Sequence, residues 1–394
     1  MKINTDEKKI QEFLTRGVEN IYPSREEFEK ALRSGKQLKI YNGVDPTGPS
    51  LHIGHGSTLL KLRELQELGH KIILLIGDFT GMIGDPTDKT ATRKKLTRKE
   101  VLANCKNYAK QAGKILDMKK VDLKYNSKWL GKLRAGDFLE LGSEITVQRL
   151  LERDMFEKRM QEAKPVYLHE FIYPLLQGYD SVAMNVDAEI GGNDQTFNML
   201  VGRDMMKSRG KEKFVLTTKL LVDSTGKKMG KTEGNMVTLE DSPEEMYGKV
   251  MSWPDTLMPV AFEICTRMPM DEIKNILAGD PRDAKMKLAR EVVTLYRSAK
   301  EANAAEENFV KIFQKKEAPE EVAEIKIKTG KTNILDLLVE TKLAASKGEA
   351  RRLVEQGGVK VGDQIISDIN AVVEIPADGV LVQKGKRHFI KVHN

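Results

Sequence analysis

Cysteine, histidine and tryptophan are scarce in this chain. Its 394 residues include two cysteines, six histidines and two tryptophans. Cys105 and Cys265 lie far apart, which excludes both a disulfide framework and a Cys-x-x-Cys zinc or redox site. A reducing, cytoplasmic location is therefore expected.

Long apolar runs are missing as well. The longest, IILLI at residues 72–76, is too short to span a bilayer, and the charged start MKINTDEKKIQEF carries acidic residues. We expect no signal peptide, transit peptide or membrane anchor. The 65 Lys and Arg against 58 Asp and Glu leave a net charge of +7, which alone is weak evidence for a polyanionic partner.

From Gln37 onward, short apolar runs bounded by glycine alternate with amphipathic stretches of helical period. Strands are predicted at LKIYNGV (38–44), KIILLIGDFTG (71–81) and VDLKYN (121–126), and again near 181–192. A helix from about Leu51, with Ser50 as its cap and Gly69 after its end, separates the first two strands. The predicted fold class is α/β with a Rossmann-like parallel sheet.

Composition divides the chain into further parts. Residues 1–236 are predicted to form the Rossmann-like domain, with a charged, mostly helical insertion near 130–165. Glycine becomes scarce over 237–316, where the pattern indicates a separate helical domain. Residues 317–331 are dense in charge, as in a linker, and 332–394 indicate a small α+β module.

Two of the six histidines stand three residues apart in the stretch HIGH. His52 and His55 fall in the first turn of the predicted helix, where backbone N–H groups and the helix dipole favour phosphate. The imidazoles can donate hydrogen bonds to a nucleotide, or they can merely cap the helix. No metal site is predicted, because two ligands do not hold a zinc ion.

A second segment also suits phosphate. DSTGKKMGKTEGN (223–235) is a glycine-bounded loop with Lys227, Lys228 and Lys231 around Met229 and Gly230. Such a loop can close its ammonium groups over a leaving pyrophosphate, or it can be a solvated basic turn.

Together, HIGH and KMGKT resemble the two nucleotide-binding motifs of class I aminoacyl-tRNA synthetases. YNGVDPTGPSLHIGH, TGMIGDP, YPLLQGYD and IGGNDQTFN are similar, in order across roughly residues 35–394, to the bacterial type of tyrosyl-tRNA synthetase. Gly230 and Thr232 stand where the family often has serine, which leaves the roles of the loop's hydroxyls open.

The resemblance implies a reaction and its phosphate site. The carboxylate of tyrosine attacks the α-phosphorus of ATP, pyrophosphate leaves together with Mg²⁺, and the tyrosyl group passes to the terminal ribose of tRNA(Tyr). No metal ion held by the protein is implied. The resemblance assigns Thr47, His52, Lys228 and Lys231 to the developing charge, His55 to the sugar, Asp194 to the ribose, and Gly43, Asp45, Gly191, Gly192, Met229 and Thr232 to the rest of the ATP site.

YPLLQGYD places Tyr173, Gln177 and Asp180 on one face of a helix. If buried, these polar groups could satisfy one another or the backbone. The resemblance instead gives the α-ammonium of tyrosine to Tyr173 and Gln177, together with Asp85, and the phenolic hydroxyl to Asp180 and Tyr41. It also implies Thr80 and Asn126 near the amino acid, Gln195 at its carboxylate, and Lys89 and Arg93 as mobile-loop cations, unless those two belong to an ordinary solvated loop.

The C-terminal module is similar to a small RNA-binding module of a small-subunit ribosomal protein. Lys347, Arg351 and Arg352 cluster on a predicted helix and Lys360 follows a glycine turn, so phosphates could be met from two elements. The resemblance implies tRNA(Tyr) as partner, an anticodon-side role for the helical domain, and a homodimer.

Three other functions remain open. A tryptophanyl-tRNA synthetase would share the nucleotide motifs but should lack Tyr41 and Asp180. A nucleotidyltransferase acting on a small cofactor would share His-x-Gly-His without needing the RNA module. A synthetase-derived RNA-binding or splicing factor would have lost catalysis, although its motif residues stand here intact.

Overall fold

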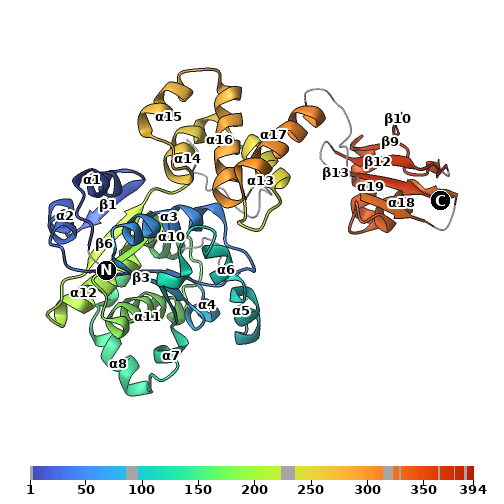
Figure 1. The fold of residues 1–394 in the computed structure, drawn as a ribbon. Helices are drawn as coiled ribbons and strands as arrows, with labels where there is room; N and C mark the ends of the chain where they lie inside the picture. The colour runs from blue at the N-terminus through green and yellow to red at the C-terminus, as the bar shows by residue number, and fades with distance from the viewer. Residues whose placement is uncertain are drawn as a thin grey trace. The chain divides into compact units, whose positions relative to one another are not determined.

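The computed structural model describes residues 3–85, 96–222, 236–313, 323–327, 330–362, 364–376, 378–385 and 388–394. The chain divides into two compact units, Met1–Ala302 and Asn303–Asn394, with the boundary inside α17 (Ala299–Phe313). Each unit contains a sheet of its own (Figure 1). Within the described ranges no helix combines the length and apolar character needed to cross a membrane.

A six-stranded sheet forms the centre of the first unit. Its order is β1-β6-β5-β2-β3-β4, and neighbours run parallel except the edge strand β1, which is antiparallel to β6. The predicted Rossmann-like α/β class is confirmed. The strands are β1 (Val18–Tyr22), β2 (Lys39–Val44), β3 (Lys71–Ile76), β4 (Val121–Tyr125), β5 (Ala188–Gly192) and β6 (Phe214–Thr218).

The strand order reverses between β2 and β5. These strands pair only as far as Tyr41 and Glu189. Beyond that point the side chain of Asn42 replaces the ladder, its Nδ2 donating to Ile190 O at 2.9 Å. The two strands therefore part toward their carboxyl ends, which is where open α/β sheets bind ligands.

Burial on both faces explains the apolar run of β3. Residues 72–76 are at most 2% exposed, as a central parallel strand requires. α3 (Ile53–Glu67) covers one face of the sheet, and α11 (Leu168–Met184) and α12 (Thr196–Ser208) cover the other (Figure 1). Gly69, at φ 93°, takes the left-handed position after α3, as predicted.

The N-terminal segment adds three elements that the sequence analysis did not predict. Phe28 of this segment stacks on Phe214 of β6 at 4.8 Å between ring centroids, and Phe13 meets Phe28 edge-on at 6.0 Å. β1 escaped prediction because an edge strand needs no continuous apolar run. The flanking helices are α1 (Glu7–Thr15) and α2 (Arg25–Arg33).

The insertion predicted near 130–165 is helical. Short helices fill the connections on either side of β4. They are α4 (Thr80–Ile83), α5 (Arg98–Cys105), α6 (Tyr108–Ala112), η1 (Met118–Lys120), α7 (Ser127–Leu130), α8 (Ala135–Ser143), α9 (Val147–Leu151) and α10 (Asp154–Gln161), with η2 (Asn193–Gln195) between β5 and α12.

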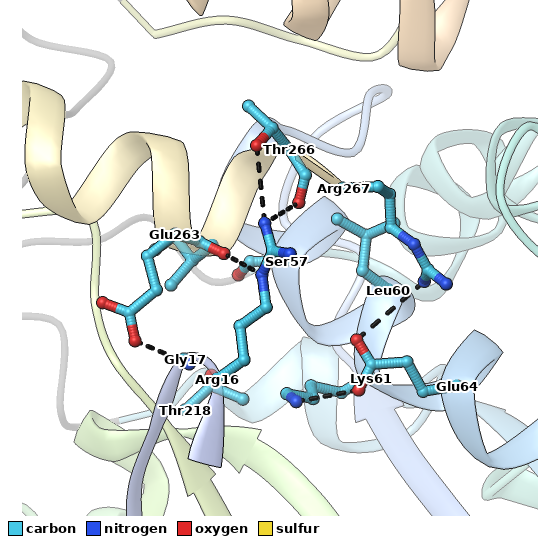
Figure 2. Close-up of a pocket in the computed structure, with 11 residues that line it drawn as sticks. Arg16, Gly17, Ser57, Leu60, Lys61, Glu64, Thr218, Glu263, Thr266 and Arg267 are labelled. Atoms are coloured by element: carbon cyan, nitrogen blue, oxygen red, sulfur yellow. Dashed lines mark hydrogen bonds and ion pairs between the residues drawn. The ribbon is translucent and has the colours of Figure 1, made fainter. Parts of the chain in front are cut away.

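The helical section after residue 236 lies within the first unit. Its elements are α13 (Pro243–Met251), η4 (Asp255–Leu257), α14 (Met258–Cys265), α15 (Met270–Leu277) and α16 (Pro281–Tyr296). Arg16, from the N-terminal segment, caps the end of α14. Its guanidinium donates to Glu263 O at 2.9 Å, Thr266 O at 2.7 Å and Met268 O at 2.8 Å, satisfying carbonyls that a helix end leaves without partners (Figure 2).

The pocket drawn in Figure 2 surrounds this cap. Its charged side chains pair with one another: Lys61 Nζ lies 2.8 Å from a carboxylate oxygen of Glu64, and Arg267 lies 3.9 Å from the other. Glu263 receives the N–H of Gly17 at 2.8 Å. The pocket thus joins elements of the fold, and we assign it no ligand.

The second unit holds a five-stranded sheet of order β10-β9-β12-β13-β7 and a two-stranded pair of β11 and β8. Its buried core includes Leu337, Leu338, Val354, Val382 and Val392. The elements are β7 (Ala323–Lys326), β8 (Lys331–Asn333), α18 (Ile334–Glu340), α19 (Lys347–Glu355), β9 (Val359–Val361), β10 (Gln364–Ile365), β11 (Val372–Glu374), β12 (Val380–Lys384) and β13 (His388–His393).

β7 falls inside the segment 317–331 that was expected to be a linker. It pairs in parallel with β13. The reason is a short alternation: Ile325 packs against the core of the unit and Ile327 is 2% exposed, while Glu324 and Lys326 are exposed.

Candidate active site

The carboxyl ends of the parallel strands gather most of the predicted residues. Tyr41 and Gly43 belong to β2, Gly191 and Gly192 end β5, and Asn126 directly follows β4. Thr80 begins α4, just after β3. Tyr173, Gln177 and Asp180 all lie on α11, which confirms the predicted helical face.

Asp180 is a buried carboxylate, 3% exposed, with two fixed donors. Trp129 Nε1 donates to its Oδ1 at 2.7 Å, and Asn126 Nδ2 donates to its Oδ2 at 3.2 Å. Burial raises the pKa of Asp180 well above its ordinary value, against these two hydrogen bonds. A carboxylate has about four acceptor sites, so it can take a further hydrogen bond from a ligand.

Tyr41 stands beside it and is also fully buried. Its hydroxyl lies 2.8 Å from Ser181 Oγ. Burial raises the pKa of Tyr41 well above its ordinary value, and the nearby charges of Glu189 and Asp180 raise it further. Tyr41 is therefore a neutral hydroxyl that can donate or accept one hydrogen.

Asp45 connects two residues assigned to the amino-acid site. Its Oδ2 accepts from the hydroxyl of Tyr173 at 2.9 Å and its Oδ1 from Thr80 Oγ1 at 2.7 Å. Asn126 Nδ2 in turn donates to Thr80 Oγ1 at 2.9 Å. A Cβ on Gly77 would lie 1.9 Å from Asp45 Oδ1, so only glycine fits at position 77 while Asp45 keeps its hydrogen bond to Thr80.

The other three residues assigned to the amino-acid site, Asp85, Gln177 and Gln195, also have partners on neighbouring elements. Gln177 Nε2 donates to Glu189 Oε1 at 3.1 Å, and Gln195 Nε2 donates to Asp85 Oδ2 at 2.6 Å. The buried guanidinium of Arg153 lies 3.9 Å from Asp85. Tyr173, Gln177 and Asp180 thus do not satisfy one another, and their polar atoms bond across elements.

His52 and His55 lie at the start of α3, which begins two positions later than predicted. His52, not Ser50, is the N-cap: its Nδ1 accepts from Gly54 N at 3.1 Å. His55 Nδ1 accepts from His52 N at 3.2 Å, and the two rings are 3.8 Å apart. An imidazole nitrogen can accept at an N-cap as a serine hydroxyl does, which explains why the helix begins at Ile53.

The chain returns to this helix start after the basic loop. Ile53 N donates to Val237 O at 3.0 Å, and Leu239 N donates to Leu51 O at 2.8 Å. The loop 223–235, with Lys228, Met229, Lys231 and Thr232, lies outside the described residues, as do Lys89 and Arg93. The described residues that follow the basic loop are thus bonded to the chain around the start of α3.

Several of the residues predicted to bind the nucleotide are small. Gly43 is exposed, and a Cβ there would make only ordinary contact, 3.8 Å from Leu75. A Cβ on Gly192 would lie 2.5 Å from Asp194 Oδ1, so glycine lets that carboxylate fold back. Thr47 is half-buried, and its N–H donates to Asp45 O at 2.8 Å. Across the described residues, no group of three or more His, Cys, Asp or Glu could hold a metal ion.

The basic residues of the second unit lie on two elements. Arg351 and Arg352 are exposed on α19, and Lys360 is half-buried on β9. Lys347 begins α19, and its ammonium pairs with Asp336.

Some residues of the amino-acid site carried no signal in the sequence. Trp129, Ser181, Glu189 and Lys213 all bond to predicted residues or to one another, yet none belongs to a motif that was singled out. They could have been found only from the three-dimensional arrangement of α7, α11, β5 and β6.

Comparison with known families narrows the remaining functions. The family described as tRNA synthetases class I (W and Y) matches residues 33–314, and the tyrosine–tRNA ligase SYY-like C-terminal domain matches residues 314–392. The chain belongs to the class I tRNA synthetases for tryptophan and tyrosine. The resemblance drawn from HIGH and KMGKT is confirmed, and with it the expectation of an ATP-using aminoacyl-tRNA synthetase.

Relatives of this class I synthetase are similar over nearly their whole length. The tyrosine–tRNA ligase of Moorella thermoacetica is 45% identical over 391 residues, covering 96% of this chain and 94% of the relative. That of Thermotoga maritima is 45% identical over 396 residues, covering 98% of each. A truncated mitochondrial tyrosyl-tRNA synthetase from Aspergillus nidulans has the same fold, with a TM-score of 0.66 at 25% identity over 77% of this chain and 94% of that one.

Proposed function

We propose that this synthetase is a tyrosine–tRNA ligase, which activates tyrosine with ATP and transfers it to tRNA(Tyr). The observation that carries the proposal is the pair of Asp180 and Tyr41. A phenolic hydroxyl entering here can donate to the carboxylate and accept from the tyrosine hydroxyl, whereas an indole or phenyl ring has no hydroxyl that could do both. The relatives named above support this choice over tryptophan.

The mechanism rests on positioning. The substrate carboxylate attacks the α-phosphorus of ATP, and the bond from that phosphorus to the pyrophosphate oxygen breaks. Thr47, His52 and His55 lie around the helix start that faces the phosphates, and backbone N–H groups there favour their charge. Lys228 and Lys231 belong to the loop that precedes Val237, the residue bonded to the start of that helix. Mg²⁺ enters with the ATP phosphates and neutralises part of their charge.

The test is exchange of labelled pyrophosphate into ATP, measured with the full chain and with tyrosine, tryptophan or phenylalanine. Exchange driven by tyrosine, and at least about a hundredfold weaker with the other two, is expected from the unpaired polar groups that they leave. Exchange driven by tryptophan would replace the proposal with a tryptophan–tRNA ligase. The absence of exchange with any of the three would move the function to RNA binding alone.

We propose that the second unit binds tRNA(Tyr) through Arg351, Arg352, Lys347 and Lys360, and that the protein acts in the cytoplasm. Replacing Arg351 and Arg352 together by alanine should weaken tRNA binding about tenfold at 0.15 M salt, because two exposed cations stop neutralising phosphates. The dependence of log Kd on log salt should become shallower by about 2. Filter binding over a salt series measures both.

The matched control is Lys331→Ala, which removes an exposed cation that pairs with Glu374 on the two-stranded sheet. It should leave affinity and salt slope unchanged. Unchanged binding by the double arginine variant would exclude this face from the tRNA site.

We propose that the synthetase is a homodimer formed through its insertion. Of the nine large apolar side chains that are exposed among the described residues, five lie between 139 and 168. Leu139 is 78% exposed and Leu168 is 76% exposed, which is costly unless another surface covers them. A second copy of this chain brings the same apolar surface to the contact, as a two-fold axis requires.

Leu168→Asp should raise the dimer dissociation constant at least about a hundredfold, because the interface would bury an unpaired carboxylate. Sedimentation velocity over a concentration series measures the constant. Ile365→Asp, at a 62% exposed position of the second unit, is the control and should sediment as wild type. A wild-type chain that remains monomeric at all concentrations would rule out the dimer.

A further inference from the structure

A fully buried ammonium lies beneath the amino-acid site. Lys213, just before β6, is 0% exposed. Its Nζ donates to Ser181 Oγ at 2.8 Å, to Met199 O at 3.1 Å and to the carboxylate of Glu189, so its three hydrogens are all used. A buried ion pair seldom improves stability over well-packed apolar residues. The pair therefore calls for a role other than stability.

The helices are built around this ammonium. α11 and α12 approach closely at two glycines: a Cβ on Gly202 would lie 3.2 Å from Gly178 Cα. The same Cβ would lie 2.7 Å from Lys213 Nζ and 2.9 Å from Ser181 Oγ. Glycine at 202 thus leaves the space in which the ammonium and the hydroxyl meet.

Two branches of hydrogen bonds lead from Lys213 to the two ends of the amino-acid site. One runs through Ser181 to the hydroxyl of Tyr41, at 2.8 Å. The other runs through Glu189, whose Oε1 accepts from Gln177 Nε2 at 3.1 Å. Lys213 thus contacts Ser181, the partner of Tyr41, and Glu189, the partner of Gln177. Tyr41 is assigned to the phenolic hydroxyl of the substrate and Gln177 to its α-ammonium group.

The donor order along the first branch gives the ammonium a function. Lys213 can only donate, so Ser181 Oγ accepts from it and keeps its own hydrogen for Tyr41. The Tyr41 hydroxyl then accepts that hydrogen and directs its own away from Ser181, toward the carboxylate of Glu189 or a ligand oxygen. Without the ammonium, Ser181 and Tyr41 can reverse their roles, and Tyr41 no longer has to present a donor.

We infer that Lys213 is a positioning residue for the amino-acid substrate, which sets the direction of the Tyr41 hydroxyl and holds Gln177 in place through Glu189. This inference rests on the proposed function, because the ligand toward which Lys213 orients these side chains is tyrosine. Lys213 acts through other side chains and touches no reacting atom.

The test uses the full chain with Lys213→Met, which keeps the length of the side chain and removes its donors. In pyrophosphate exchange the KM for tyrosine should rise about 10- to 100-fold, the range of one or two hydrogen bonds to a charged group. The preference for tyrosine over phenylalanine should fall about tenfold. The KM for ATP should stay within about twofold, because the branches do not reach the nucleotide side.

Lys61→Met is the matched control. Lys61 is 4% exposed and donates to Phe13 O and to Glu64, both at 2.8 Å, far from the amino-acid site. Its loss should lower thermal stability while leaving the KM for tyrosine and the preference over phenylalanine unchanged. If Lys61→Met changes both quantities as Lys213→Met does, the role of Lys213 is only structural and the inference fails.

Ser181→Ala keeps the inference testable if Lys213→Met does not fold. It removes only the hydroxyl between the ammonium and Tyr41, and the preference for tyrosine should again fall about tenfold. Adding it to Lys213→Met should cost nothing further in preference, because both act through one chain of bonds. If Ser181→Ala keeps the wild-type preference for tyrosine over phenylalanine, the inference fails. If the wild-type protein shows no exchange with tyrosine, it is the proposed function that fails.

Discussion

Asp180→Ala is expected to reduce kcat/KM for tyrosine about a thousandfold in pyrophosphate exchange. The change removes the acceptor for the phenolic hydrogen and leaves two buried donors, Trp129 Nε1 and Asn126 Nδ2, without the carboxylate they bond. Each such loss costs roughly 1–3 kcal/mol. Together they amount to about 4 kcal/mol, a factor of about a thousand.

The same carboxylate predicts a pH dependence. Asp180 is a good acceptor for the phenolic hydrogen only when it is ionised, because neither of its oxygens then carries a proton. Burial holds the pKa of Asp180 well above the ordinary value. The KM for tyrosine should therefore rise as pH falls through that raised pKa, while Asp180→Asn should show a flat profile. The KM for ATP serves as the internal reference in both proteins.

Glu263→Ala is the control for the loss of a hydrogen-bonded carboxylate. Glu263 accepts from Gly17 N at 2.8 Å and from Lys219 Nζ at 2.9 Å, away from the amino-acid site. It should lose stability without losing its affinity for tyrosine. If Asp180→Ala kept wild-type exchange, Asp180 would not be the phenol acceptor.

Gly77→Ala is expected to be the most damaging conservative substitution in the sheet. The new methyl group would lie 1.9 Å from Asp45 Oδ1 and 2.5 Å from Thr80 Oγ1. Asp45 would have to move and lose its hydrogen bonds to Thr80 and Tyr173. We expect a loss of about 2–4 kcal/mol in the free energy of unfolding and at least a hundredfold loss of tyrosine activation.

Gly142→Ala provides the opposite case. Gly142 lies in α8, and a Cβ there meets nothing within 4 Å. Alanine should stabilise the helix by roughly 0.5–1 kcal/mol and leave activity unchanged. Urea unfolding and pyrophosphate exchange on both variants measure the contrast. Equal stability of the two variants would mean that Asp45 can turn away without cost.

The sequence predicted the parts of the site that depend on local pattern. Tyr173, Gln177 and Asp180 share a face because the helical period puts them there, and Tyr41 meets them because parallel strands end at one edge. Lys213 could not be predicted in this way. Lys213 lies between the exposed Glu212 and Phe214. Nothing in the sequence KEKF (211–214) indicates that Lys213 is buried and Lys211 is not.

Two local expectations failed for definite reasons. Ser50 is the usual kind of cap, but His52 accepts the first helical N–H and moves the helix start to Ile53. The charged segment 317–331 was predicted to be a linker, yet it contains the four-residue strand β7, which pairs with β13. Two apolar side chains, Ile325 within the strand and Ile327 just after it, are enough to pack this short strand against the core.

The cap that Arg16 places on α14 ties the beginning of the first unit to residues some 250 positions later in the chain. The family model matches the chain only from residue 33, so Arg16 lies before the part that this model describes. A fragment that started there would keep every residue proposed for the nucleotide and the amino acid and lose the bonds that Arg16 makes at the end of α14. Arg16 thus joins the N-terminal segment to the helical section of the same unit, and we expect the sheet and the helical section to unfold together rather than one after the other.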